Sequence, residues 1–305
     1  MNRALVIRGG AIGDFVLTLP AIKLLRDQFP RVHLEILGYT HIIALAEKRF
    51  YADGIRSLEQ GLLAAFFARD AALPAELTDY FGSFDLIVSY LHDPDGIFQN
   101  NLRRCGIKVF IAGPPKLNGQ EHAALQLARP LEQIGLHLKN SAARIFLTER
   151  DREVAREFLG NATKPAFALH PGSGSETKNW PIEKWKQLGE HLFSTNHTVL
   201  VVAGEAEEGR LRLLEAAWKG KPVRIAKSLA LPCLAALFES TIFVGHDSGI
   251  SHIAAAAGAR CILLFGPTDP VVWAPANKNV TVMRAPNGNL PSLDVDPVAA
   301  ACGLR

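Results

Sequence analysis

Short apolar runs alternate with longer amphipathic segments along almost the whole chain. The short runs have the length of buried strands, whereas the longer segments carry apolar residues at helical spacing. A strand followed by a helix and another strand is typical of a parallel sheet covered by helices, so the pattern predicts an α/β protein. The expected strands are residues 4–8, 32–37, 86–89 and 108–111 in the first half of the chain, and 166–170, 198–203, 223–226, 242–245 and 260–265 in the second.

The clearest predicted helix spans residues 14–28, where Phe15, Leu19 and Ile22 recur at helical spacing. Further helices are expected at residues 150–159, 182–193, 207–218, 232–238 and 249–257. The segment Gly-Asn-Ala-Thr-Lys-Pro at residues 160–165 is typical of a linker. We therefore expect two doubly wound, Rossmann-like domains, which are residues 1–160 and residues 161–305.

Composition narrows the classes of protein that this chain can be. Of its 305 residues, 48% are hydrophobic, which is enough for buried cores and excludes a disordered or low-complexity chain. The 33 basic residues nearly balance the 30 acidic ones, so the net charge of +3 indicates no nucleic-acid partner. The cysteines lack C-x-x-C spacing, the first residues lack the pattern of a signal peptide, and no apolar stretch is long enough to span a membrane. We expect a cytoplasmic protein with reduced thiols.

Loops that follow strands are the candidates for chemistry, because ligands of open parallel sheets bind beyond the carboxyl ends of the strands. The first such loop is residues 9–14, with the sequence GGAIGD. It is not a dinucleotide fingerprint, because that spacing requires glycine where the chain has Arg8. Asp14 has two possible roles, and it can hold both. It can cap the helix, and its carboxylate can remove a proton from a sugar hydroxyl.

The second candidate loop comprises residues 170–181, with the sequence HPGSGSETKNWP, between a predicted strand and a predicted helix. Its small residues allow backbone amides to approach a phosphate, and Lys178 adds a positive charge. The order of residues is not that of a Walker loop. The alternative is a flexible surface turn with an exposed lysine.

The third candidate loop comprises residues 244–252, with the sequence VGHDSGISH, and precedes a helix of small residues. Ser248 and Gly249 lie where this helix begins, and the free amides and positive dipole end there suit a diphosphate. A diphosphate would repel Asp247, so this carboxylate suits the hydroxyls of a sugar. Alternatively, Asp247 caps the helix and His252 is an interior histidine.

Two further loops are weaker candidates. Residues 266–270, GPTDP, follow a strand and could line the same crevice, or they form a rigid proline turn with a capping aspartate. Residues 204–208, GEAEE, could place a carboxylate against a ribose diol or could start a helix with acidic residues. The His, Cys, Asp and Glu residues show no metal-ligand spacing, so no catalytic metal is expected.

Four of these separated motifs together resemble glycosyltransferase family 9, which contains the ADP-heptose:lipopolysaccharide heptosyltransferases. The motifs are Gly13-Asp14 with Leu19-Pro20, the segments HPG and KNWP at residues 170–172 and 178–181, DSGISH at residues 247–252, and GPTDP at residues 266–270. The resemblance runs from about residue 3 to residue 286. It implies a GT-B fold, in which two Rossmann-like domains face each other across a cleft and the C-terminal domain holds most of a nucleotide-sugar donor.

The resemblance also implies roles for individual residues. Asp14 matches the family's catalytic aspartate, Lys178 matches its phosphate-binding lysine, and Asp247 matches its donor-contacting aspartate. The family's small hydroxyl residues near the diphosphate fall in the segment from Ser173 to Thr177. The expected donor-binding residues are Ser173, Thr177, Lys178, Asp247, Ser248, Gly249 and His252. No acceptor-binding residue is assigned.

The activity that this resemblance implies is inverting glycosyl transfer without a cofactor or a metal. The expected donor is a nucleotide sugar, above all ADP-heptose, and the expected acceptor is a hydroxyl of a lipid-linked lipopolysaccharide core precursor. Such an acceptor implies peripheral contact with the inner face of the cytoplasmic membrane, and no stable protein partner is indicated. Two alternatives stay open, which are a GT-B nucleotide-sugar epimerase and a non-catalytic module that binds nucleotide sugars or glycans.

Overall fold

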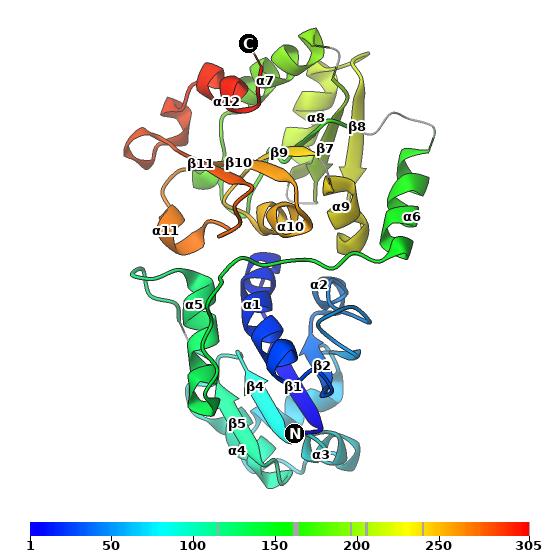
Figure 1. Ribbon diagram of the computed structural model, residues 1–305, viewed down its shortest axis with the longest axis vertical. Coiled ribbons are helices and arrows are strands. Elements are labelled where there is room, and N and C mark those ends of the chain that lie inside the picture. Colours follow the sequence, from blue (N-terminus) through cyan, green and yellow to red (C-terminus); the bar gives the residue numbers. More distant parts are fainter. Residues whose placement is uncertain (115, 161–164, 196, 205–206, 240, 305) are drawn as a thin grey trace. The chain divides into compact units, whose positions relative to one another are not determined.

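The chain forms two compact units, Met1–Ser141 and Ala142–Arg305, in a computed structural model (Figure 1). The structure describes all residues except 115, 161–164, 196, 205–206, 240 and 305. Each unit is built on one parallel sheet with helices packed against it. The α/β class predicted from the hydrophobic pattern is therefore confirmed in both halves of the chain.

The first unit contains a five-stranded parallel sheet with the strand order β3-β2-β1-β4-β5. Its strands are β1 (Arg3–Arg8), β2 (His33–Gly38), β3 (Gly54–Ser57), β4 (Leu86–Ser89) and β5 (Val109–Ala112). Its helices are α1 (Ile12–Gln28), α2 (Thr40–Ile43), α3 (Ala75–Gly82), α4 (Ile97–Arg104) and α5 (Ala123–Ala128), with 3-10 helices η1 (Gly61–Phe67) and η2 (Arg129–Ile134).

Strand β1 lies at the centre of this sheet because its side chains are apolar on both faces. Leu5 and Ile7 pack in one hydrophobic cluster with phenylalanines contributed by η1, α3 and α4. Ala4 and Val6 alternate with them, so they point to the other face of the sheet. Helix α1 packs beside α5 and lies over the strands in Figure 1. The strand is thus fixed from both sides, which also fixes the loop that follows it.

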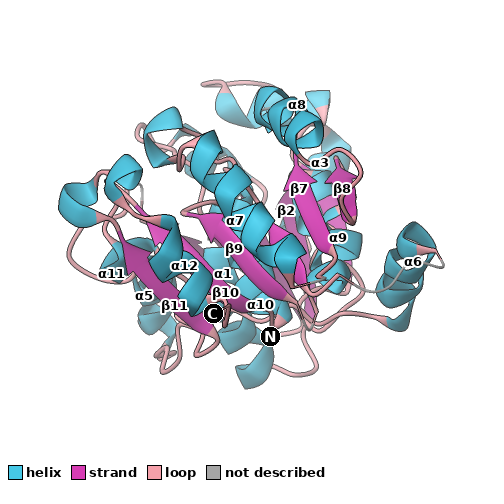
Figure 2. Ribbon diagram, turned by 90° about the horizontal axis from the view of Figure 1, so that it is seen from above, coloured by secondary structure: helices cyan, strands magenta, loops and turns pink. Residues whose placement is uncertain are grey.

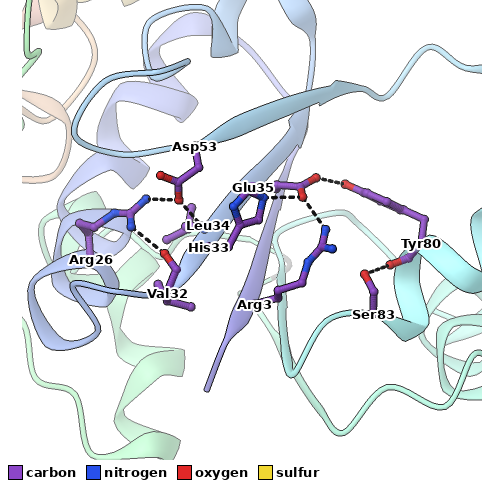
Figure 3. A network of polar contacts seen from close by, with 9 residues as sticks. All are labelled: Arg3, Arg26, Val32, His33, Leu34, Glu35, Asp53, Tyr80 and Ser83. Carbon is purple, nitrogen blue, oxygen red and sulfur yellow. Dashed lines mark hydrogen bonds and ion pairs between the residues drawn. The ribbon is translucent and has the colours of Figure 1, made fainter.

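A polar network ties together the elements at the amino ends of these strands (Figure 3). Arg3, the first residue of β1, donates to Glu35 Oε1 at 2.6 Å, and the Tyr80 hydroxyl donates to Glu35 Oε2 at 3.0 Å. Arg26 of α1 donates to Asp53 at 2.8 Å, and the same carboxylate accepts the N–H of Leu34. Because this network lies at the opposite ends of the strands from the candidate loops, its role is structural.

The second unit contains a six-stranded parallel sheet with the order β11-β10-β9-β6-β7-β8 (Figure 2). Its strands are β6 (Phe167–Leu169), β7 (Val199–Ala203), β8 (Val223–Lys227), β9 (Ile242–His246), β10 (Arg260–Phe265) and β11 (Val280–Arg284). Its helices are α6 (Glu149–Leu159), α7 (Ile182–Ser194), α8 (Glu208–Ala217), α9 (Leu231–Phe238), α10 (Gly249–Ala257), α11 (Pro270–Trp273) and α12 (Val295–Ala301), with 3-10 helices η3 (Glu176–Lys178), η5 (Pro286–Gly288) and η6 (Leu290–Ser292).

Helices cover both faces of this second sheet. Helices α7 and α12 lie across the strands in Figure 2, and α9 and α10 lie on the opposite side of the strands in Figure 1. Trp180 and Trp185 are completely buried and belong to the main core cluster together with Trp218, which packs against α7. Gly189 in α7 allows this packing, since a Cβ atom there would lie 2.3 Å from the Trp218 ring.

The boundary between the units differs from the expected one at residue 160. Helix α6 packs on α9 (Figure 1). Arg152 forms two hydrogen bonds of 2.9 Å with Glu239. Upstream of α6, the N–H of Ile145 donates to the carbonyl of Ala256 at 2.8 Å. These contacts assign residues 142–159 to the second unit. Helix α6 packs there because it is amphipathic and buries its apolar side against that unit. Residues 161–164 of the expected linker lie outside the described residues.

All nine expected strands are present within one or two residues of their predicted bounds. The structure adds β3 and β11, which are edge strands of the two sheets. Each is only partly buried along its length, so neither carries a continuous apolar run that the sequence pattern could reveal.

Candidate active site

The loop after β1 lies at the carboxyl edge of the first sheet together with the loops after β2 and β4. The strand register places Arg8 opposite Gly38 of β2 and Ile7 opposite Ser89 of β4. Because all these strands are parallel, their following loops emerge at the same edge. The first candidate loop is therefore located as the sequence pattern predicted.

Asp14, the last residue of that candidate loop, lies in the first turn of α1, which begins at Ile12. Its Oδ2 accepts the N–H of Ala11 at 2.9 Å, and its side chain is 39% exposed. Gly10 adopts φ +90°, and a Cβ atom there would lie 2.6 Å from the same oxygen. Glycine is thus required for the turn that brings the loop against the carboxylate. Asp14 thus caps the helix from its first turn by accepting the N–H of the N-cap residue Ala11, and its carboxylate stays partly exposed; its role as a base stays a prediction.

Lys178 and Asp247 meet at the carboxyl edge of the second sheet. The Lys178 Nζ atom donates to Asp247 Oδ2 at 2.8 Å, and the side chains are 31% and 11% exposed. Lys178 follows β6 and Asp247 follows β9, and these two strands are neighbours in the sheet. Two residues that sequence reasoning placed at one donor site are therefore in direct contact within this unit.

His246, the last residue of β9, fixes the loop that carries Lys178. Its Nε2 atom accepts the N–H of Trp180 at 2.8 Å, so Nδ1 bears the proton and donates to the carbonyl of Gly172 at 3.3 Å. Burial lowers the pKa of His246 to about 3, which keeps the imidazole neutral. The side chain thereby attaches both ends of the loop to β9.

A second contact holds the same loop from α8. Arg210 donates to Glu176 at 2.8 Å and to the carbonyl of Trp180 at 3.1 Å. Hydrogen bonds from Arg210 and then from Asn179 lower the pKa of Glu176, so its carboxylate is ionised at neutral pH. The loop is therefore anchored, which contradicts the alternative interpretation of a flexible surface turn.

Helix α10 begins directly after Asp247, and its cap is Ser248. Ser248 Oγ accepts the N–H of Ser251 at 3.3 Å, so Asp247 is not the cap that one interpretation had assigned. The Asp247 carboxylate binds Lys178 instead. Helix geometry leaves the N–H groups of Gly249 and Ile250 without an intrahelical acceptor. These two amides and the helix dipole make this end of α10 suitable for an anion.

Three other predicted donor-site residues, Ser173, Thr177 and His252, differ in their exposure to solvent. Ser173 is 8% exposed, and its hydroxyl donates to the carbonyl of Ser175 at 2.9 Å. Thr177 is exposed, with its hydroxyl 2.9 Å from Ser175 Oγ. His252 is 5% exposed within α10, which is the environment of an interior histidine. Direct donor contacts by these three side chains stay predictions.

Glu207, which lies between β7 and α8, packs against the loop after β6. Glu207 Oε2 accepts the N–H of Gly204 at 2.8 Å, and the side chain is 8% exposed. A Cβ atom on Gly172 would lie 2.0 Å from Glu207 Cγ, so only glycine fits there. Asp269, in the loop after β10, accepts the N–H of Val271 at 3.0 Å and is the expected cap of α11. The packing of Glu207 on Gly172 thus supports the loop that carries Lys178.

The described residues contain neither a metal-binding cluster nor a membrane-spanning helix. In that part of the chain, no group of three or more His, Cys, Asp and Glu side chains is arranged to hold a metal ion. Among the same residues, no helix combines the length and the apolar character that a membrane crossing requires. The four cysteines are not joined in disulfides.

Comparison with protein families decides which class of protein has this arrangement. The model of glycosyltransferase family 9 (heptosyltransferase) matches residues 119–299, which is more than half of the chain. The chain belongs to glycosyltransferase family 9. This assignment confirms the resemblance seen in the motifs and favours glycosyl transfer over an epimerase or a non-catalytic module.

Curated relatives match this glycosyltransferase over nearly its full length. It is 24% identical to lipopolysaccharide heptosyltransferase 1 of Escherichia coli strain K12, and the alignment covers 97% of this chain and 98% of the relative. It is 25% identical to lipopolysaccharide heptosyltransferase 1 of Pseudomonas aeruginosa, with 88% of this chain and 79% of the relative covered.

Solved structures share the fold of the glycosyltransferase. A glycosyl transferase family 9 protein from Veillonella parvula has a TM-score of 0.82 at 19% identity, covering 99% of this chain and 96% of that one. The ADP-heptose lipopolysaccharide heptosyltransferase II of E. coli has a TM-score of 0.81 at 14% identity, covering 99% and 98%. The expected GT-B class with two parallel-sheet domains is confirmed by these likenesses.

Proposed function

We propose that the glycosyltransferase moves heptose from ADP-heptose to a hydroxyl of a lipopolysaccharide core precursor, with inversion at the anomeric carbon. The acceptor oxygen attacks that carbon from the face opposite the diphosphate, forming the new C–O bond as the bond to the diphosphate breaks. ADP leaves, and the proton of the acceptor hydroxyl passes to a base of the protein. Each of these demands corresponds to a group at the carboxyl edge of one of the two sheets.

The observation that carries the proposal is the Lys178–Asp247 ion pair beside the first turn of α10. An anionic diphosphate at this edge gains the charge of Lys178 and the amides of Gly249 and Ile250. Asp247 would repel the same diphosphate, but its bond to Lys178 compensates the carboxylate. Its remaining acceptor capacity suits hydroxyl groups of the donor sugar.

Departure of ADP creates charge on the terminal phosphate oxygen, which the same groups stabilise. Lys178 is held on a loop that His246 and Arg210 anchor, so its ammonium group does not have to reorganise during the reaction. The amides of α10 are fixed by the helix itself. In this proposal these groups supply the positive charge that a metal ion supplies in other transferases.

Asp14 is the proposed base in the first unit. Its carboxylate is partly exposed, and one of its two oxygens is fixed by the N–H of Ala11. A carboxylate is a far weaker base than an alkoxide, so the proton moves late, when formation of the C–O bond has made the hydroxyl acidic. In this proposal Asp14 acts on the acceptor hydroxyl, and the groups of the second unit act on the donor.

The lipid-linked acceptor determines where in the cell the proposed reaction takes place. An enzyme that acts on such an acceptor and uses a cytoplasmic nucleotide sugar works at the inner face of the cytoplasmic membrane. We propose peripheral contact of this kind. No protein partner is part of the proposal.

The test is product analysis with purified protein. ADP-heptose is incubated with and without a heptose-free core precursor, and products are identified by mass spectrometry and by the anomeric signal in NMR spectra. The proposal predicts heptosylated acceptor of inverted configuration, formed only when the acceptor is present. A changed sugar in the reaction without acceptor would identify an epimerase, and ADP-heptose binding without any product would identify a binding module.

A further inference from the structure

The residue that breaks the dinucleotide fingerprint, Arg8, lies directly beneath Asp14. It is the last residue of β1, and its side chain is only 11% exposed. Its Nε and Nη2 atoms donate to the backbone carbonyl of Asp14 at 3.3 and 3.2 Å. Nη2 also lies 3.5 Å from Asp14 Oδ1. One guanidinium group therefore contacts both the backbone and the carboxylate of the proposed base.

Thr18 completes the contacts of this guanidinium group. Arg8 Nε donates to Thr18 Oγ1 at 3.0 Å, and that hydroxyl donates to the Asp14 carbonyl at 2.7 Å. Thr18 is completely buried in α1, one turn after Asp14. The first turn of the helix is thus bonded to the end of β1 through a planar group with fixed geometry.

The ring of Tyr90 supports Arg8 from the side of β4. The guanidinium carbon lies 5.6 Å from the ring centroid, within the range of cation–π contact. The Tyr90 hydroxyl donates to the carbonyl of Leu127 at 2.8 Å, and the ring packs so closely on Gly113 that a Cβ atom there would lie 2.3 Å from it. Tyr90 is thus held through its hydroxyl and its ring, and it packs beside the guanidinium group of Arg8.

We propose that Arg8 is a positioning residue that holds the Asp14 carboxylate in the orientation needed to accept the acceptor proton. The inference rests on the proposed function, because it matters only if Asp14 is the base. Asp14 Oδ2 is fixed by the N–H of Ala11 and Oδ1 faces Arg8, so the carboxylate plane is defined from two directions. Arg8 touches no reacting atom and acts only through Asp14.

This arrangement explains why the loop departs from the dinucleotide pattern. A glycine at position 8 would serve close approach of a diphosphate to the backbone. An arginine there fills the space under the loop with a buried cation instead. The first sheet of this chain is thereby specialised to present a carboxylate, and the diphosphate is left to the second unit.

Substitution by lysine keeps the charge but removes the planar fork, so Arg8→Lys is the informative variant. We expect it to lower kcat about 10-fold, because a misplaced catalytic group loses rate steeply with small displacements. The KM for the donor and the Kd for ADP should stay unchanged, since the donor is bound by the second unit. Arg3→Lys, on the same strand but in the structural network, is the matched control and should keep the kcat of the wild type.

The double variant Arg8→Lys/Asp14→Asn separates positioning from a general structural effect. If Arg8 acts through Asp14, the double variant has the kcat of Asp14→Asn alone, within about twofold. If its loss instead equals the product of the two single losses, or if Arg8→Lys keeps the kcat of the wild type, the inference is overturned. Should Asp14→Asn itself keep normal turnover, the assignment of the base fails, which is a distinct outcome.

Thermal unfolding of each variant guards against misfolding. If Arg8→Lys lowers the unfolding midpoint so far that the rates cannot be compared, Thr18→Ala replaces it. This variant removes the hydroxyl that bridges Arg8 and the Asp14 carbonyl. Its smaller loss of kcat should likewise disappear in the Asp14→Asn background, and a loss that persists there would contradict the inference.

Discussion

Lys178 donates to Asp247 across 2.8 Å although the two residues are 69 positions apart in the chain. The contact forms because β6 and β9 are neighbours in the second sheet and their following loops emerge at one edge. Asp247 is nearly buried, so without Lys178 its carboxylate would be uncompensated. The pair therefore stabilises this edge of the sheet, and in the proposed function it also presents opposite charges to the two parts of a sugar diphosphate.

Replacing Lys178 by alanine should weaken ADP binding about 10- to 100-fold, because a hydrogen bond to a charged group contributes about 1.5–3 kcal/mol. Turnover should also fall, since the leaving ADP loses its ammonium partner. Lys178→Arg keeps the charge and should bind ADP better than Lys178→Ala does. Isothermal titration calorimetry and steady-state kinetics test this. Unchanged affinity together with an unchanged rate would remove Lys178 from the site.

Two glycines of one loop form a matched pair for a packing test. A Cβ atom on Gly172 would lie 2.0 Å from Glu207 Cγ, whereas one on Gly174 would meet nothing within 4 Å. We expect Gly172→Ala to lower the free energy of unfolding by about 1–3 kcal/mol, because overpacking forces Glu207 and the loop apart. Gly174→Ala should change it by less than about 0.5 kcal/mol. Denaturant unfolding measures both, and equal effects of the two substitutions would contradict the packing described.

Burial of His246 predicts a pH dependence of stability. The folded-state pKa of His246 is about 3, and an unfolded histidine has a pKa of about 6.5. Between these pH values the unfolded chain binds a proton that the folded chain does not. The free energy of unfolding should therefore fall as the pH decreases below about 6.5, by up to about 1.4 kcal/mol per pH unit for this one group.

The control for this prediction is His246→Gln, which keeps a neutral side chain with a donor and an acceptor. The free energy of unfolding of this variant should depend less steeply on pH between 6.5 and 5. The difference in slope from the wild type should be approximately that of one bound proton. Burial also lowers the pKa of His170, so some pH dependence remains in the variant. Equal slopes for the two proteins in denaturant titrations would show that His246 is protonated in the folded chain.

Turnover should not depend on added divalent metal. In the proposed mechanism, Lys178 and the amides at the start of α10 stabilise the charge on departing ADP. We expect the rate to persist in excess EDTA. Loss of activity in EDTA that is restored only by Mg²⁺ would contradict this part of the mechanism.

Much of the fold follows from the sequence because central strands are buried on both faces. Strands β4 and β10 consist of apolar residues except for Ser89 at the end of β4 and Arg260 at the start of β10, and their predicted bounds match the structure. The edge strands β3 and β11 escaped prediction because partial exposure permits polar residues such as Arg56 and Thr281. The boundary between the units was misplaced because a change of residue composition does not reveal which unit α6 packs against.

The residues of the candidate site likewise fall into those that the sequence indicates and those that it does not. Asp14, Lys178 and Asp247 could be predicted because charged side chains in loops after strands stand out from their neighbours. His246 and Arg8 could not, because each is the last residue of a buried strand and its partners are not evident from the sequence. His246 bonds to Trp180 on the loop of a neighbouring strand, and Arg8 bonds to Thr18 in the helix that follows its own strand.

The most direct test of the account is the Asp14→Asn variant, assayed with donor and acceptor. The change keeps the size of the side chain and removes its basicity. The account predicts that kcat falls by roughly 100-fold or more, because a positioned base contributes about that factor. The Kd for ADP should stay that of the wild type, since the donor is held by the other unit. Near-normal turnover of Asp14→Asn would contradict the account.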